Sequence, residues 1–269
     1  MDKVLKEFGL TRGKLLRMLR GRTRKPMILK RAITDKMFYF AIVSDTHLCS
    51  TEERLDELHT FYEICRKEGI KYVVHAGDLV AGTNIYRGQE NEIHTFGFKR
   101  QASYAIRNYP KVDGIETFFI TGNHDLDYWK RAGVDIGETI SEKRPDMVYL
   151  GQDQADVVLG GVQIRLFHPG GGTAYADSYH LQRTIASLEA GTKPQILVMG
   201  HYHRTLYLFD RNVHGFLGGT FEGQTTFQLR KRINPMIGGW TVQCRIAEDE
   251  FNSVVAIQPC WIPFFKEGG

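Results

Sequence analysis

Short apolar runs that each end in acidic, amide or imidazole side chains limit the fold of this chain more than any other feature. Runs at 38–43, 71–75, 117–120 and 195–199 lead in turn to Asp45-Thr46-His47, Gly77-Asp78, Gly122-Asn123-His124-Asp125 and Gly200-His201-Tyr202-His203. Runs of this length are typical of buried strands. Open α/β sheets place their sites where strands pass into loops, so we expect these polar residues to form one site.

A fifth apolar run, residues 162–167, leads to His168, Pro169 and three glycines. His168 is the loosest member of the set, and its place at the end of a strand supports including it. Another histidine nearby, His180, falls within the stretch 178–189, where apolar residues recur at helical spacing. There we expect a polar contact or a packed side chain rather than a metal ligand.

From Met37 onward the chain alternates between strand and helix patterns. Apolar residues at helical spacing predict helices at 54–68, 92–108 and 178–189, and further strands are predicted at 206–209, 240–245 and 254–258. Short turns between some of the later strands indicate antiparallel pairing. This order predicts an α/β fold in which two mixed β-sheets are covered by helices.

Residues 1–36 differ in charge from the rest of the chain. They carry twelve lysines and arginines against three acids, a net charge of +9, whereas residues 37–269 carry 23 basic and 28 acidic residues, a net charge of −5. Apolar residues at helical spacing within 2–20 predict two short helices, and the basic stretch 20–26 is typical of a linker. We therefore expect a basic helical N-terminal appendage over 1–36 and one main domain over 37–269.

The composition favours an intracellular, cytoplasmic protein. No run approaches the roughly 18 apolar residues of a membrane span, and the basic first thirty residues lack the apolar centre of a secretory signal. The four cysteines form no CxxC pair and do not resemble a disulfide framework, so we expect reduced thiols.

The polar residues after the strands are a ligand set for transition metals. Carboxylates, imidazoles and one carboxamide, with no thiolate, suit Mn, Fe, Zn or Ni better than Ca or Mg alone. Seven ligands exceed one tetrahedral shell, and they suffice for two metals if one carboxylate bridges. We expect two divalent transition metal ions, with Mn first among them.

The ordered motifs Asp-x-His, Gly-Asp, Gly-Asn-His-Asp, His and Gly-His-x-His resemble those of the calcineurin-like metallophosphoesterase superfamily, over residues 37–210. The resemblance implies a four-layer αββα sandwich. It also implies a ligand set: Asp45, His47 and His203 for one metal, Asn123, His168 and His201 for the other, and Asp78 as the bridge. The chain departs from the superfamily at the fourth motif, where His168-Pro169 replaces the common His-Gly.

The same resemblance implies the chemistry of the site. A hydroxide shared by the two metals attacks phosphorus, because metal binding lowers the pKa of a water. His124 stabilises the transition state or protonates the leaving group. Asp125 is expected to hold the His124 imidazole in the required tautomer.

The motif forms favour a phosphodiester substrate. Gly77-Asp78 continues as Leu79-Val80-Ala81-Gly82 and lacks the Asp-Arg-Gly of the protein Ser/Thr phosphatase branch, so an arginine that would hold a phosphomonoester is absent there. Gly122-Asn123-His124-Asp125 resembles the form found in nuclease and phosphodiesterase branches. A DNA or RNA nuclease is the first interpretation. The alternatives are a phosphomonoesterase or cyclic-nucleotide phosphodiesterase, and, in another class, a non-catalytic nucleic-acid-binding protein on this fold.

Two segments bear on substrate binding. The loop 82–89 brings Tyr86 and Arg87 close to the second motif, where a ring stacks on a base and a guanidinium holds phosphate; otherwise it is a solvated loop. The basic N-terminus is either a phosphate-contacting arm for DNA or RNA or a solvated tail that packs Leu15 and Leu19 against the domain. The oligomeric state is left open.

Overall fold

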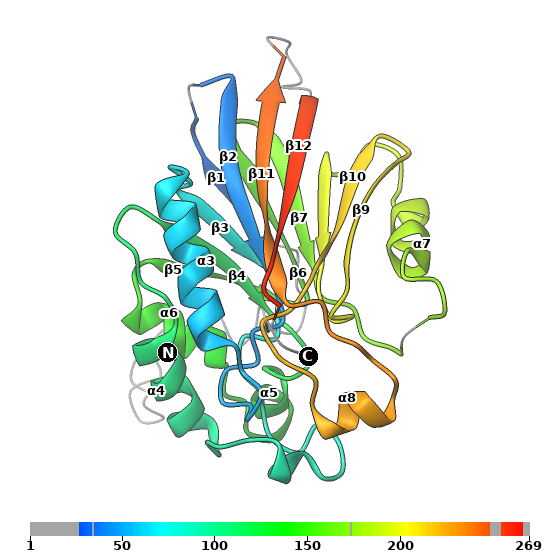
Figure 1. Cartoon of the computed structure of the whole chain (residues 1–269). Coiled ribbons are helices and arrows are strands. Elements are labelled where there is room, and N and C mark those ends of the chain that lie inside the picture. The colour runs from blue at the N-terminus through cyan, green and yellow to red at the C-terminus, as the bar shows by residue number, and fades with distance from the viewer. Residues whose placement is uncertain (1–26, 34, 173, 248–253, 266–269) are drawn as a thin grey trace, which may run out of the picture.

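The computed structural model of the chain describes residues 27–33, 35–172, 174–247 and 254–265, and stacks two six-stranded mixed sheets face to face (Figure 1). The first sheet runs β1 (Ile28–Arg31), β6 (Gln154–Leu159), β7 (Val162–Phe167), β8 (Ile196–Met199), β10 (Val213–Gly218) and β9 (Thr205–Asp210). The second runs β12 (Val254–Pro263), β11 (Gly238–Ile246), β2 (Met37–Val43), β3 (Tyr72–His75), β4 (Glu116–Thr121) and β5 (Met147–Gln152). The helices are α3 (Leu55–Lys67), α4 (Phe98–Asn108), α5 (Asp127–Ala132), α6 (Ile136–Lys143), α7 (Tyr179–Ser187) and α8 (Thr226–Arg230), with a 3₁₀ turn η1 (Gln89–Asn91).

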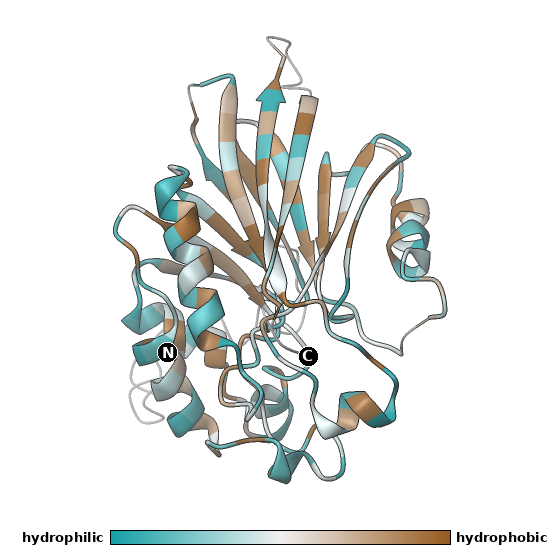
Figure 2. Ribbon diagram, in the orientation of Figure 1, coloured by the Kyte–Doolittle hydropathy of each residue, from teal (hydrophilic) through white to brown (hydrophobic). Residues whose placement is uncertain are grey.

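Three apolar clusters hold the layers together. Between the sheets, Phe40, Phe118 and Val157 belong to one fully buried cluster. A second cluster packs α3, α4 and α6 on the outer face of the second sheet, and a third packs α7 on the outer face of the first. Figure 2 shows the apolar colouring concentrated in the strands, with polar residues on the outer turns of α3. Strands buried on both faces need such continuous apolar runs, which is why the central strands stand out in the sequence.

The two-sheet α/β sandwich confirms the predicted fold class. Helix α4 begins only at Phe98, because Gly97 adopts φ 86° and ends the preceding loop, so the expected helix start at 92 is wrong. Strand β1 pairs in parallel with β6, so residues 28–31 lie in a sheet of the sandwich although the expected boundary near Met37 put them in the appendage. Two basic residues in a four-residue strand hide it from an apolar pattern.

The expected helices within 2–20 and the linker 20–26 lie outside the described residues. Within the part of the chain that the structure describes, no helix combines the length and the apolar character that crossing a membrane would require.

Candidate metal centre

The sheet topology brings the predicted ligands to one end of the sandwich. Strands β2, β3 and β4 are parallel neighbours, so the residues after them share one edge of the second sheet. Strands β7 and β8 are parallel neighbours in the first sheet. Asp45, His47, Asp78 and Asn123 follow strands of the second sheet, and His168, His201 and His203 follow strands of the first. The candidate site is therefore built from both sheets.

One group of ligands gathers around His203. Its Nε2 lies 3.1 Å from Nε2 of His47 and 3.5 Å from Oδ1 of Asp45. His47 Nε2 lies 3.9 Å from the same Asp45 oxygen. All three side chains are at least 90% buried. These three donor atoms are close enough to bind one metal ion.

A second group gathers around Asn123. Its Oδ1 lies 2.8 Å from Nδ1 of His201 and 3.1 Å from Nε2 of His168. Asp78 joins the two groups, because its Oδ2 lies 3.2 Å from His168 Nε2 and 3.8 Å from His47 Nε2. Asp78 therefore lies between the two groups, where a carboxylate could contact ions in both.

Hydrogen bonds fix which ring nitrogens face the site. His168 Nδ1–H donates to the carbonyl of Ala76 at 2.7 Å, and His201 Nε2–H donates to the carbonyl of Gly171 at 2.7 Å. Their other nitrogens face the oxygens of Asp78 and Asn123, and each is a lone-pair acceptor when it carries no proton of its own. Acceptors packed against acceptors in a buried site repel unless a cation lies between them. The donor set thus fits divalent metal ions with nitrogen and oxygen ligands.

The pKa values of several site residues in the metal-free protein also indicate that positive charge is stabilised there. Burial opposes protonation of His168, yet contact with Asp78 raises its pKa to about 10. Contact with Asp45 likewise raises the pKa of His203 against the effect of burial. Burial would raise the pKa of Asp45, but His203 and His168 hold it at about 2. His168 and His203 carry protons that metal ions would replace, whereas burial lowers the pKa values of His47 and His201.

The ligand backbone is held in an uncommon conformation. Asp45, His47, Asp78, His201 and His203 have φ of 50°, 41°, 55°, 82° and 53°. Residues other than glycine adopt positive φ at a cost of about 1 kcal/mol or more, and such residues concentrate at functional sites. The conformation persists because the loops bond to one another: the backbone N–H of Asp45 donates to Gly77, that of His47 to Asp78, and that of His201 to the Asp45 carboxylate.

The glycines that precede the ligands are required by close approach. A Cβ on Gly77 would lie 2.5 Å from Nδ1 of His168, and a Cβ on Gly200 would lie 2.5 Å from the carbonyl oxygen of Ala76. A Cβ on Gly122 would overlap Oδ1 of Asp78. Glycine is therefore needed at these positions, because ligand side chains pack against Gly77 and Gly122 and the carbonyl of Ala76 packs against Gly200.

His75 ties two ligand loops together. Its Nδ1 accepts the backbone N–H of Gly77 at 3.2 Å, and its Nε2 lies 3.1 Å from Oγ1 of Thr46, which donates to the carbonyl of Leu79. Burial lowers the pKa of His75 to about 4, so the ring is neutral at pH 7. His75 thus supports the loops that carry Asp45 and Asp78 from behind.

The expected role of Asp125 is wrong. Its carboxylate accepts backbone N–H groups of Leu79, Val80 and Gly122 at 2.9–3.0 Å and does not orient the His124 ring. The carbonyl of Ala81 does so instead, accepting from His124 Nδ1–H at 2.7 Å. Asp125 therefore joins the second and third motif loops, and His124 presents Nε2 to the site.

Glu222, for which the sequence predicts no role, lies buried behind His203. Its Oε2 accepts from Nε2 of Gln228 at 2.7 Å and lies 3.9 Å from Nδ1 of His203. Burial raises the pKa of Glu222 to about 7. Nε2 of Gln228 also lies 3.2 Å from His203 Nδ1, so Glu222 acts on the ring through Gln228. Partners behind a metal-binding histidine orient the ring. Glu222 follows no strand motif, so only its position after β10 hinted at a place near the site.

A cavity of about 520 Å³ opens over the ligands, and we call it the metal cavity. Its wall includes His124, Tyr86, Phe227, Lys231 and Tyr202. The Tyr86 ring stacks on Phe227 with centroids 4.0 Å apart. Of the two predicted substrate residues, Tyr86 thus reaches the cavity, whereas Arg87 is exposed and lies outside its lining.

Comparisons with known proteins find relatives of this chain among subunits of an archaeal DNA polymerase. The chain is 26% identical over 286 residues to the DNA polymerase II small subunit of Archaeoglobus fulgidus, across 90% of this chain and 58% of that protein. It is 24% identical over 247 residues to the protein of the same name from Halobacterium salinarum, across 78% of this chain and 49% of that protein. The chain spans about half the length of the curated relatives it matches.

Solved structures resemble the chain more distantly. A structure described as a novel archaeal phosphodiesterase has a TM-score of 0.46 at 15% identity, covering 84% of this chain and 100% of that one. Vacuolar protein sorting 29 from Cryptosporidium parvum has a TM-score of 0.44 at 14% identity, covering 86% and 100%. The sequence match is more specific: residues 38–205 match the calcineurin-like phosphoesterase family. The resemblance seen in the motifs is confirmed, and the chain belongs to the calcineurin-like phosphoesterases.

Proposed function

We propose that the chain is a metal-dependent phosphodiesterase that uses two metal ions to cleave DNA or RNA. The observation that carries the proposal is the position of the Asp78 carboxylate, within 3.8 Å of histidines from both ligand groups. Family membership and the three clusters of potential metal ligands support phosphoester hydrolysis. Asp45, His47 and His203 would hold one ion, Asn123, His168 and His201 the other, and Asp78 both. When bound, the two ions would activate a water and neutralise charge on the phosphoryl group.

The chain's own residues complete the reaction. His124 lies against His47 with ring centroids 4.5 Å apart, and its Nδ1–H is held by Ala81, so the ring in its doubly protonated form gives the Nε2 proton to the leaving oxygen and keeps the one on Nδ1. The backbone N–H of His124 donates to Asp78 at 2.8 Å, which fixes the imidazole relative to the bridging carboxylate.

Two observations favour nucleic acid as the substrate. The metal cavity offers the Tyr86–Phe227 stack and Lys231 on one wall, a combination of aromatic and cationic groups that suits a nucleotide chain. The matched relatives are named as small subunits of a DNA polymerase. The same name favours a second candidate function, a subunit that holds DNA within a polymerase assembly without cleaving it.

A substrate panel separates the two candidates. The Mn-loaded protein is expected to hydrolyse bis-p-nitrophenyl phosphate and single-stranded DNA faster than p-nitrophenyl phosphate. Asp78→Asn is expected to lose metal and turnover together, whereas His124→Gln keeps the metal and loses about 10²–10⁴ in kcat. DNA binding without hydrolysis of any ester would favour the non-catalytic subunit. A preference for the monoester would contradict the nuclease assignment.

A further inference from the structure

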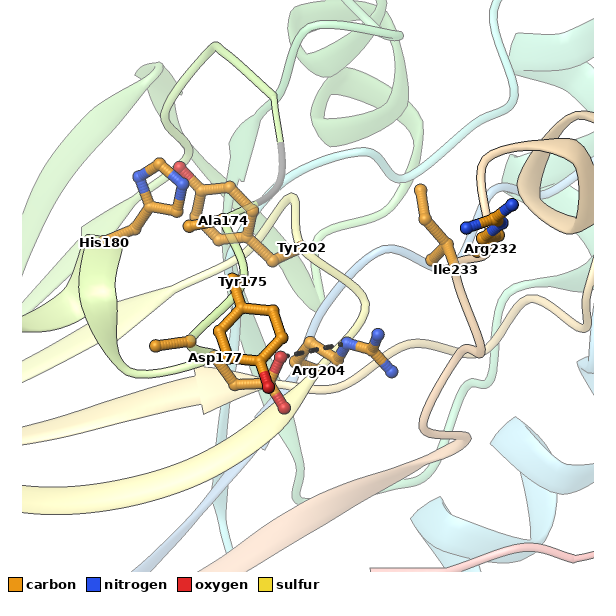
Figure 3. Close-up of a pocket in the computed structure, with 9 residues that line it drawn as sticks. Ala174, Tyr175, Asp177, His180, Tyr202, Arg204, Arg232 and Ile233 are labelled. Atoms are coloured by element: carbon orange, nitrogen blue, oxygen red, sulfur yellow. Dashed lines mark ion pairs between the residues drawn. The ribbon is translucent and has the colours of Figure 1, made fainter.

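A second, smaller pocket adjoins the metal cavity, and we call it the side pocket. It has a volume of about 200 Å³ and is lined by Ala174, Tyr175, Ala176, Asp177, His180, Tyr202, Arg204, Arg232 and Ile233 (Figure 3). Tyr202 and Ile233 line both spaces, so the side pocket begins where the metal cavity ends. Tyr202 directly follows the ligand His201, and their ring centroids are 5.1 Å apart. A substrate at the metals therefore has its next chemical group within reach of the side pocket.

The side pocket has a rigid aromatic wall. The His180 ring stacks on Tyr202 with centroids 4.4 Å apart and planes 10° from parallel. His180 was expected to be a packed or polar-contact residue, and this stack on α7 agrees with that expectation. Tyr175 is fully exposed, and Figure 3 shows its ring on the same side of the pocket as Tyr202. An exposed tyrosine ring beside a fixed one offers a surface on which a flat ring can stack.

The side pocket also carries an excess of positive charge. Arg204 is held in place, because its Nε lies 3.4 Å from the Asp177 carboxylate and its Nη1 donates to the carbonyl of Asn234 at 2.6 Å. Arg232 is exposed on the opposite wall, beside Ile233, at a φ of 58° (Figure 3). Two guanidinium groups against one carboxylate leave a net positive charge. A guanidinium in this setting suits a phosphate oxygen.

We propose that the side pocket binds the nucleotide next to the scissile phosphate, with its base against Tyr175 and its own phosphate held by Arg232. The inference rests on the proposed function, because it places a second unit of the same substrate chain. A pocket of this size takes one base and excludes a base pair, so the nucleotide must be unpaired. The enzyme therefore acts on single strands or frayed ends.

Substrates with and without a base test the side pocket. The Mn-loaded protein is assayed on the p-nitrophenyl ester of thymidine 5′-phosphate and on bis-p-nitrophenyl phosphate, which has no base. Tyr175→Ala is expected to lower the ratio of the two kcat/KM values about tenfold, which matches the loss of one stacking contact, whereas Arg232→Ala should leave the ratio unchanged because the thymidine ester has no phosphate besides the scissile one. Arg211→Ala is the matched control, since Arg211 is also an exposed arginine at positive φ (50°), in the β9–β10 turn. An unchanged ratio in Tyr175→Ala, including an equal fall on both esters, would overturn the proposal.

A direct binding measurement tests the side pocket even if the protein hydrolyses no ester. Fluorescence anisotropy of labelled four-residue thymidine and uridine oligonucleotides is measured with the same proteins. Affinity about tenfold weaker in Arg232→Ala and Tyr175→Ala, with Arg211→Ala at the wild-type value, would support nucleotide binding in the side pocket. If no ester is hydrolysed in the same preparations, only the proposed hydrolysis would be contradicted. Equal affinities in all four proteins would overturn the pocket. Comparison of the two oligonucleotides tells whether the bound strand is DNA or RNA.

Discussion

His168 in the loop after β7 donates a hydrogen bond to the carbonyl of Ala76 directly after β3, at 2.7 Å, across the interface between the two sheets. The bond leaves Nε2 of His168 facing Asp78 and Asn123. His168→Ala is expected to remove one metal ion per chain while the other group of ligands still binds, which metal analysis after dialysis measures. His59→Ala is the control, because His59 contacts only the exposed end of α4 through Asn108. Two retained metals would show that His168 is not a ligand.

Glu222→Gln is expected to weaken metal binding about 10–100-fold, the usual effect of losing the partner behind a metal-binding histidine. The substitution keeps the shape of the side chain but removes the charge that faces Nδ1 of His203. Titration calorimetry with Mn measures the change, and Glu189→Gln, on an exposed loop, serves as the control. Affinity equal to that of the control would mean that Glu222 does not act on the metal centre.

Gly122→Ala is expected to abolish metal binding, because the new methyl group would overlap the Asp78 carboxylate. Gly170→Ala should have no such effect, since a Cβ there meets no atom within 4 Å. Metal content and thermal unfolding of both variants make the comparison. A Gly122→Ala protein that retains two metals would show that the Asp78 loop can shift without loss of the site.

The lowered pKa of the buried His75 leads us to expect that the stability of the metal-free protein depends on pH. Its pKa is about 4 in the folded chain and about 6.5 when unfolded, so between these values the unfolded chain binds a proton that the folded chain does not. The contribution of His75 to the free energy of unfolding is therefore complete above about pH 6.5 and falls as the pH drops, by up to about 3 kcal/mol near pH 4. Urea unfolding at about pH 7 and about pH 5 should show a smaller loss in His75→Gln than in the wild type. Equal losses would refute the role of His75.

Deleting residues 1–26 is expected to lower DNA affinity and the slope of its logarithm against salt. This segment carries nine basic and two acidic residues, and each phosphate contact adds about one to the slope. Ending the deletion at 26 rather than 36 preserves strand β1 and its pairing with β6. Anisotropy with labelled DNA over a salt series measures both quantities. An unchanged slope would leave the basic segment without a part in DNA binding.

The sequence predicts the metal ligands better than their surroundings, for a physical reason. Asp45, Asp78 and His201 each follow a strand buried on both faces, and such strands are readable as continuous apolar runs. Glu222 reaches the site through tertiary packing after β10, which no local pattern records. The prediction for Asp125 was wrong for the same reason, because its carboxylate bonds to the backbone of Val80, 45 residues earlier in the chain.

Strands at the margins were also hard to predict. Strand β6 contains Gln154 and Asp156, and Asp156 is buried only because it pairs with Arg165 on β7. Such a pair makes a polar residue compatible with a sheet but leaves no apolar alternation to read. The central sandwich is therefore predictable from the chain alone, and its outer strands depend on contacts that form only in the fold.

Because the ligands come from both sheets, a bound metal ion would act as a crosslink between the two halves of the sandwich. Its binding free energy then adds to the free energy of unfolding, in proportion to the logarithm of the free metal concentration. The melting temperature of this protein should rise with each tenfold increase in Mn, and chelation should let the sheets separate first at the ligand end. Metal supply would thus govern how long the folded chain persists, independently of any ester it cleaves.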